Sequence, residues 1–158
     1  RKDIDLRSSK DKNTRKLQKE MDKFLNENSD ITSLWNWLGN VDDIFVHYRQ
    51  ADALLTPSFY EGLPVVICEA MSTGCFVIAS DVCDHPLLIK EGNRGLLCKP
   101  HSPESICLAI ERFNNMKLER RNEIVYEARK FAENNFNLEK MVNSYELLLN
   151  KKLDIIKK

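Results

Sequence analysis

Three short apolar segments, set apart by helical patterns, constrain the fold of this chain most strongly. They span residues 53–56, 75–80 and 95–98. Strands that are buried on both faces read as continuous apolar runs, whereas half-exposed strands alternate. Strands alternating with helices predict a parallel sheet with helices on both of its faces. We therefore expect one α/β domain with a parallel sheet and a helical C-terminal tail.

Apolar residues at helical spacing and terminal residues predict the helices. The expected ranges are 13–28, 42–51, 65–73, 102–113, 118–134 and 138–151. Within 42–51, Ile44, Phe45 and Tyr48 are expected to face inward. Residues 31–38, which are rich in aromatic and β-branched side chains, predict a short strand and a turn. The segment 65–73 also has strand propensity, but Pro64 before it and Gly74 after it favour a helix.

Composition excludes several classes of function. The chain has 158 residues with 24 basic and 24 acidic side chains, so no charge bias indicates nucleic-acid binding. Its five cysteines are scattered without a Cys-x-x-Cys pair, and its three histidines are isolated. We therefore expect no metal site, no disulfide framework and a reducing cytoplasmic location. No apolar run approaches the roughly 18 residues that a membrane-spanning helix needs.

The chain opens with Arg1 and a polar segment up to Lys12. We interpret this start as that of a piece cut from a longer protein, so that its function is divided across the boundary.

Glu61 and Glu69 are the most informative polar residues. Glu61 lies in a loop rich in turn residues, and Glu69 interrupts the apolar run 65–71, where a charge is costly unless it is paired. The loop follows the strand 53–56 and leads into a helix, and ligands of parallel sheets bind at such edges. Unpaired N–H groups at a helix start attract phosphate.

The backbone N–H groups available at this helix start are those of Leu63, Val65 and Val66, because Pro64 has none. Glu69 lies about 7–8 Å along the helix axis. One carboxylate on each side of a phosphate site matches the length of a sugar–diphosphate–ribose molecule. The alternative stays open that Glu69 occupies a solvent-facing strip and that Glu61 is an ordinary loop charge.

The two glutamates belong to a longer series of motifs between about Gly39 and Phe113. In order, the pieces are 38–43, 51–53, 57–58, 61–64, 69–71, 74, 79–82 and 95–97. This series resembles family 4 retaining glycosyltransferases, whose donor-binding motif is a glutamate, seven residues and a second glutamate. A pair of glutamates alone is a weak signal, but the collinear pieces together identify the family.

The resemblance implies an enzyme of the GT-B type, in which two Rossmann-type domains face each other across a cleft. This chain resembles the C-terminal half. We expect a truncated donor-binding domain over 1–135, and over 136–158 a helix that in the family packs back toward the N-terminal domain. By the same resemblance, Glu61 contacts hydroxyls of the transferred sugar and is the catalytic residue, whereas Glu69 holds the ribose hydroxyls.

The other implied contacts come from the backbone or line the base. Gly62, Leu63, Val65 and Val66 are expected to contact the sugar and the diphosphate, and residues from Leu38 to Val41 to line the base pocket. The implied reaction transfers a hexosyl group from a nucleotide sugar to an acceptor hydroxyl and retains the anomeric configuration. Positioned charges stabilise its transition state. The family's usual scheme needs no metal or other cofactor.

Two departures from the family limit this expectation. Pro64 stands where many members have glycine, which removes one backbone donor. A first strand and a glycine-rich turn with basic residues are expected before Arg1, together with the domain that binds the sugar or lipid-linked acceptor. We therefore expect negligible transferase activity from this chain alone.

Other readings remain open. A non-catalytic nucleotide-sugar-binding module or another GT-B-like enzyme, such as an epimerase or a phosphorylase, also needs a phosphate site, but not this spacing of glutamates. The Glu-Gly-Leu-Pro variant suggests bacterial surface polysaccharide or glycolipid assembly. The basic ends, 1–19 and 151–158, suggest peripheral contact with the inner face of the membrane, or else are solvated surface. Asp81 follows the strand at 76–79, where capping the next turn is at least as good an interpretation as facing the cleft. His85 is similarly placed, and a lone histidine is more often structural than functional.

Overall fold

The computed structural model describes residues 12–34, 36, 38 and 41–156. The chain divides into two compact units, Arg1–Ile44 and Phe45–Lys158. In the first unit, helix α1 (Lys12–Glu27) is followed by the short helix α2 (Ser29–Thr32). The Thr32 hydroxyl donates a hydrogen bond to the carbonyl of Leu25 in α1.

The strand predicted over residues 31–38 is wrong. Ile31 and Thr32 lie in α2, and their N–H groups both donate to the carbonyl of Asn28, each at 3.1 Å. These local bonds override the strand propensity of β-branched side chains. None of the described residues of 33–38 lies in a strand, while Trp35 and Trp37 are outside the described residues.

The second unit contains a three-stranded parallel sheet. Its strands are β1 (Ala53–Thr56), β2 (Phe76–Ser80) and β3 (Leu96–Cys98), in the order β1-β2-β3. Thr56 pairs with Ala79, and Ser80 pairs with Cys98. All five residues of β2 are buried, as expected for the central strand of a covered sheet. The predicted α/β fold with a parallel sheet and flanking helices is confirmed.

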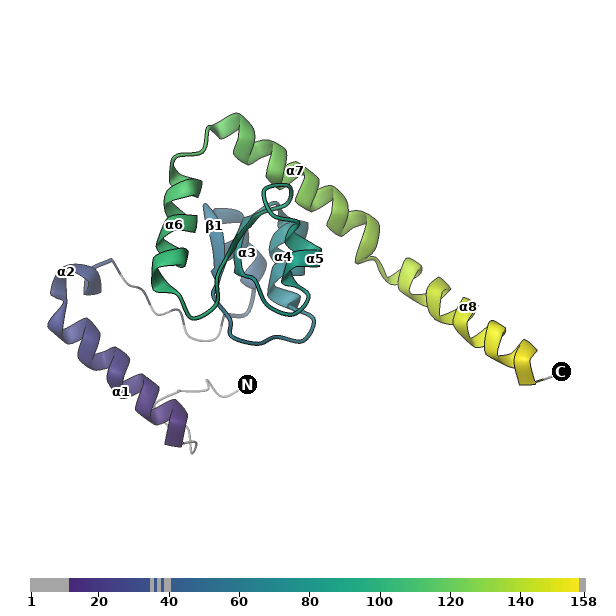
Figure 1. Cartoon of the computed structure of the whole chain (residues 1–158), viewed down its shortest axis with the longest axis horizontal. Coiled ribbons are helices and arrows are strands. Elements are labelled where there is room, and N and C mark those ends of the chain that lie inside the picture. Colours follow the sequence, from purple (N-terminus) through teal and green to yellow (C-terminus); the bar gives the residue numbers. More distant parts are fainter. Residues whose placement is uncertain (1–11, 35, 37, 39–40, 157–158) are drawn as a thin grey trace. The chain divides into compact units, whose positions relative to one another are not determined.

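Helices cover both faces of this sheet. Figure 1 shows α6 (Pro103–Asn114) on one side of the sheet, and α3 (Ile44–Gln50), α4 (Val65–Thr73) and α5 (His85–Ile89) on the other. Phe76 and Ile78 of β2 pack with Phe113 of α6 and with Ile124 of α7 (Leu118–Asn135). Helix α7 also packs along α4 and contacts β2.

Helix α4 has the bounds that the sequence predicts. Pro64 precedes it, and Gly74 ends it with φ 79°, a left-handed conformation that glycine adopts without strain. Its buried residues are Ile67, Ala70 and Met71, whereas Val65 and Val66 are exposed.

Three further predictions differ from the structure. Helix α5 was not predicted, because it is only five residues long and begins close to Pro86. In α3, Tyr48 is buried but Phe45 is 41% exposed, so the inward orientation of Phe45 is wrong. Helix α8 (Leu138–Ile156) continues beyond the predicted end at residue 151. Residues 137–150 are all exposed, and the domain boundary at 135/136 stays a prediction.

Among the described residues, none of the helices combines the length and the apolar character needed to cross a bilayer.

Candidate functional site

The candidate site lies at the edge of the sheet where the parallel strands end. Strand β1 ends at Thr56 and is followed by the loop 57–64 that leads into α4, and β2 ends at Ser80. Because the strands are parallel, their carboxyl ends share one edge, which is where sheets of this type bind ligands. Glu61 lies in the loop and Glu69 in the middle of α4, both partly buried.

A serine hydroxyl holds the Glu61 carboxylate, and further hydroxyls hold that serine. The Ser58 hydroxyl donates to Glu61 Oε1 at 2.8 Å and lies 3.3 Å from the Thr56 hydroxyl. The Ser80 hydroxyl, at the end of β2, donates to the main-chain carbonyl of Ser58. His85 Nδ1 is 2.7 Å from the carbonyl of Ser80, and both of these side chains are fully buried. The structure therefore assigns His85 a structural contact.

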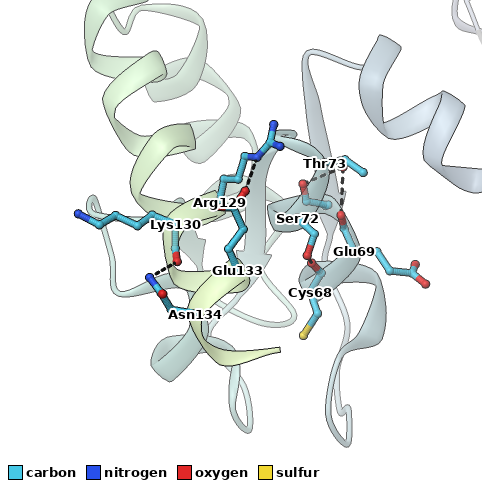
Figure 2. A network of polar contacts seen from close by, with 9 residues as sticks. Cys68, Glu69, Ser72, Thr73, Arg129, Lys130, Glu133 and Asn134 are labelled. Carbon is cyan, nitrogen blue, oxygen red and sulfur yellow. Dashed lines mark hydrogen bonds and ion pairs between the residues drawn. The ribbon is translucent and has the colours of Figure 1, made fainter. Parts of the chain in front are cut away.

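Tyr48 supplies the partner that the position of Glu69 requires. The Tyr48 hydroxyl donates to Glu69 Oε2 at 3.2 Å, and its side chain on α3 is only 6% exposed. Burial, and secondarily the Glu69 charge and this hydrogen bond, raise the pKa of Tyr48 to about 12. Figure 2 shows the Glu69 carboxylate directed away from α7, while the Thr73 hydroxyl donates to its main-chain carbonyl at 3.0 Å. The charge in the apolar run is thus paired by hydrogen bonding.

The start of α4 offers backbone donors. The N–H groups of Ile67 and Cys68 donate to the carbonyl of Pro64, at 3.0 and 3.2 Å. The N–H groups of Val65 and Val66 precede these bonds, so helical geometry gives them no partner inside the helix. A backbone N–H pair of this kind, at the positive end of the helix dipole, attracts an anion.

Apolar side chains are exposed around this helix start. The residues concerned are Phe59, Tyr60, Leu63, Val65 and Val66, which are between 41% and 80% exposed. Gly62 is also exposed, with open space around its Cα. Exposed apolar groups gathered in one place mark a surface that binds a ligand or a partner.

A hollow of about 360 Å³ adjoins the same loop. Pro57 and Phe59 line it on one side, and residues 99–103 with Ile106 line it on the other. The rings of Phe59 and His101 stack with their centroids 4.1 Å apart, which ties the loop after β1 to the loop after β3.

The residues predicted to line a base pocket belong to the first unit. There Leu38 is 52% exposed and Val41 is partly buried, while Gly39 and Asn40 lie outside the described residues. Their role stays a prediction.

Three cysteines with low exposure, in α4, directly before β2 and in β3, are not activated as nucleophiles. Burial raises the pKa of the thiols of Cys68, Cys75 and Cys98. A thiol with a raised pKa stays protonated near neutral pH and reacts poorly. Within the described part of the chain, no three histidine, cysteine or carboxylate side chains gather as metal ligands. The predicted lack of a metal or other cofactor stays a prediction.

The series of motifs from Leu38 to Leu97 is not an isolated resemblance. Residues 10–131 match the family described as "Glycosyl transferases group 1". The chain belongs to this family. The match covers both glutamates, the loop between them and the whole three-stranded sheet.

Relatives of known name agree with this membership. The chain is 30% identical over 116 residues to the Escherichia coli protein named UDP-Gal:alpha-D-GlcNAc-diphosphoundecaprenol alpha-1,3-galactosyltransferase. That match covers 70% of this chain and 27% of the relative. The chain spans between 14% and 30% of the length of the curated relatives it matches first.

Solved structures share the fold. Anabaena Alr3699/HepE, solved in complex with UDP, matches with a TM-score of 0.79 and 19% identity over 89% of this chain and 38% of that one. The C-terminal domain of a group 1 glycosyl transferase (LpcC) from Francisella tularensis matches with a TM-score of 0.63 and 21% identity. It covers 75% of this chain and 64% of that domain. The chain therefore has the fold of one part of these glycosyl transferases, which are of the GT-B type.

Several residues at the site were not found from the sequence. Tyr48 was expected only to face inward, although a buried tyrosine hydroxyl usually needs a polar partner. Ser58 was recognised as part of a motif, without a role. Ser80 and His101 meet the loop only because the strands bring distant segments to one edge, which no local pattern reveals.

Proposed function

We propose that this chain is the donor-binding part of a retaining glycosyltransferase that transfers a hexosyl group from a nucleotide sugar to an acceptor hydroxyl. One observation carries the proposal in a chain of this family. Two partly buried carboxylates, each with its own hydroxyl donor, flank a helix start with unpaired N–H groups. This arrangement suits a ligand with a phosphate between two hydroxyl-bearing rings.

Each part of the site has a distinct role in the proposal. The N–H groups of Val65 and Val66, with the backbone of Gly62 and Leu63, bind the diphosphate and the adjoining sugar. Glu69 accepts hydrogen bonds from the ribose hydroxyls, because carboxylates make stronger hydrogen bonds than neutral acceptors do. Glu61 accepts hydrogen bonds from the transferred sugar and orients it. Leu38 and Val41 contact the base.

The reaction breaks the bond between the anomeric carbon and the diphosphate and forms a bond to the acceptor oxygen on the same face. The acceptor hydroxyl gives its proton to the leaving diphosphate. Negative charge develops on the leaving diphosphate, and the start of α4 stabilises it with fixed dipoles. Positive charge develops at the anomeric carbon, and the nearby Glu61 carboxylate stabilises it. None of these steps uses a thiol of this chain.

Similar proteins support the classes of substrate. Alr3699/HepE has been solved with UDP and with UDP-glucose, which supports a UDP-sugar donor. The name of the Escherichia coli relative includes a diphosphoundecaprenol-linked sugar, which supports a lipid-linked acceptor and a role in surface polysaccharide or glycolipid assembly. A lipid-linked acceptor also supports a peripheral location of the protein at the cytoplasmic face of the membrane.

We further propose that the 158-residue chain alone has negligible transferase activity. The curated relatives are several times longer than this chain, which supports the proposal. In the proposal, the acceptor is bound mainly by a domain outside the 158 residues.

Calorimetric titration of the chain with a panel of nucleotides and nucleotide sugars tests the proposal. We expect one nucleotide sugar to bind best, and Glu69→Ala to weaken it by about tenfold or more, the value of a hydrogen bond to a charged group. Glu111→Ala, on the exposed surface of α6, is the matched control and should leave binding unchanged. Binding by Glu69→Ala as tight as that of the original chain would refute the role of this residue.

A further inference from the structure

The Glu61 carboxylate stands at the end of a chain of hydrogen bonds that starts in the core. His85 Nδ1 contacts the Ser80 carbonyl at 2.7 Å, the Ser80 hydroxyl contacts the Ser58 carbonyl, and the Ser58 hydroxyl contacts Glu61 Oε1 at 2.8 Å. Ser80 and His85 are fully buried, whereas Ser58 and Glu61 are partly buried. The series therefore runs from the interior toward the ligand edge.

The direction of each bond follows from its acceptor. Carbonyl and carboxylate oxygens accept only, so His85 Nδ1, Ser80 Oγ and Ser58 Oγ are all donors. The single hydroxyl proton of Ser58 is then committed to Glu61. The Thr56 hydroxyl, 3.3 Å from Ser58 Oγ, can approach it only as the donor. Each donor in the series thus lies on the core side of its acceptor, and the last donor, the Ser58 hydroxyl, bonds Glu61.

The stack of Phe59 on His101 ties the loop to the segment after β3, but it does not hold the Glu61 carboxylate. Tyr60, directly before Glu61, is 80% exposed, so the Ser58 hydroxyl is the contact that orients the carboxylate. The Ser80 hydroxyl fixes the backbone of Ser58, and the Ser58 hydroxyl then fixes one oxygen of Glu61. Glu61 Oε2 receives no hydrogen bond from the part of the chain that the structure describes. One oxygen is held and the other is presented to the ligand.

We propose that Ser58 and Ser80 are positioning residues that orient Glu61 toward the transferred sugar. They act through Glu61 and do not themselves contact the ligand. The inference rests on the proposed function, because it assumes that Glu61 meets the sugar and not the nucleotide. It predicts that loss of either hydroxyl weakens recognition of the sugar and leaves recognition of the nucleotide intact.

The test compares UDP with UDP-glucose. For each variant, the dissociation constant of UDP divided by that of UDP-glucose measures how much the sugar contributes to binding. Glu61→Gln sets the reference for a lost carboxylate charge. We expect Ser58→Ala and Ser80→Ala to lower this ratio by about threefold or more, as Glu61→Gln also should. The affinity for UDP itself should change less than about twofold. Ser58→Thr keeps a hydroxyl at this position and should restore the ratio.

A second readout needs no ligand. In the free chain, NMR couplings of the Glu61 side chain should show one dominant rotamer, and in Ser58→Ala they should show averaging over several. A single rotamer in Ser58→Ala would overturn the positioning role whatever the ligand does.

The outcomes separate the two claims. If Glu61→Gln loses the sugar contribution while Ser58→Ala and Ser80→Ala keep it, the positioning role is wrong and the proposed function stands. If Glu61→Gln keeps the sugar contribution, the role proposed for Glu61 itself is wrong, and with it the positioning of a sugar contact. A parallel loss of UDP affinity in Ser80→Ala would show a general disruption of the site and would also contradict the inference.

Discussion

The Glu69 carboxylate lies beside the side chain of Tyr48, which is almost completely buried. The Tyr48 hydroxyl loses contact with water but keeps a hydrogen bond to a carboxylate, and such charge-assisted bonds are stronger than neutral ones. Ionisation of Tyr48 would place a second negative charge beside Glu69 in a poorly solvated place. This is why the pKa of Tyr48 rises to about 12, with burial as the larger cause.

The contact between Tyr48 and Glu69 predicts that the pKa of Tyr48 is lower in Glu69→Gln. Removing the carboxylate charge should lower the pKa of Tyr48 from about 12 toward its ordinary value of 10.0, without reaching it, because burial remains. NMR titration of the Tyr48 ring carbons measures the shift directly. Glu111→Gln is the matched control and should leave the pKa of Tyr48 at about 12. An unchanged Tyr48 pKa in Glu69→Gln would show that the two groups are not coupled.

The raised pKa of Tyr48 also makes the stability of the fold depend on pH. A group whose pKa is raised on folding stabilises the folded state below its unfolded pKa, and this contribution is lost as the pH rises through the folded pKa. From pH 10 to about 12, the free energy of unfolding should therefore fall by at most about 1.4 kcal/mol per pH unit through Tyr48. The fall should be smaller in Glu69→Gln, and the difference between the two curves isolates this pair.

Among the elements, α4 is the one that the sequence defines best. Pro64 and Gly74 are local signals for the two ends of a helix, and they predict its bounds although its first residues favour a strand. The failures are equally local. The β-branched residues of 31–38 predict a strand, but Ile31 and Thr32 lie in the helix α2. Helices α2 and α5, of four and five residues, are too short to show a helical period.

The candidate site was predictable only in part, for a physical reason. The two glutamates and the helix start between them lie within nine residues of sequence, so a motif reveals them. Their partners come from elsewhere: Tyr48 is 21 positions from Glu69, and Ser80 is 22 positions from Ser58. Such contacts form because parallel strands bring separate segments to one edge, and a single sequence does not encode that proximity locally.

The helix start allows a selective test of its backbone donors. Val65→Pro removes one N–H group at the first helical position, where proline is tolerated and no intrahelical bond is lost. We expect UDP to bind about tenfold more weakly, the value of one hydrogen bond to a charged group. The free energy of unfolding should change by less than about 1 kcal/mol. Isothermal calorimetry and denaturant unfolding measure the two quantities.

A matched control exists at another helix start. Leu118→Pro makes the same change at the first residue of α7, after Lys117, whose extended conformation suits a following proline. It should leave UDP affinity unchanged. Equal UDP affinity in Val65→Pro and in the original chain would exclude the Val65 N–H group as a diphosphate donor.

At the scale of the whole molecule, the chain presents one ligand edge and a long exposed helix. The sheet, the helices on its two faces and the loop 57–64 form the second unit, and this unit contains both glutamates. Helix α8 is exposed over all its residues from 138 to 150, including a stripe that contains Met141, Tyr145 and Leu148.

The central claim is that Glu61 and Glu69 hold opposite ends of one nucleotide sugar across the start of α4. A crystal structure of the chain in complex with UDP-glucose tests it most directly. The account predicts the ribose hydroxyls within hydrogen-bonding distance of Glu69, the diphosphate at the N–H groups of Val65 and Val66, and the glucose at Glu61. A ligand bound in the reverse direction, or away from the start of α4, would contradict it.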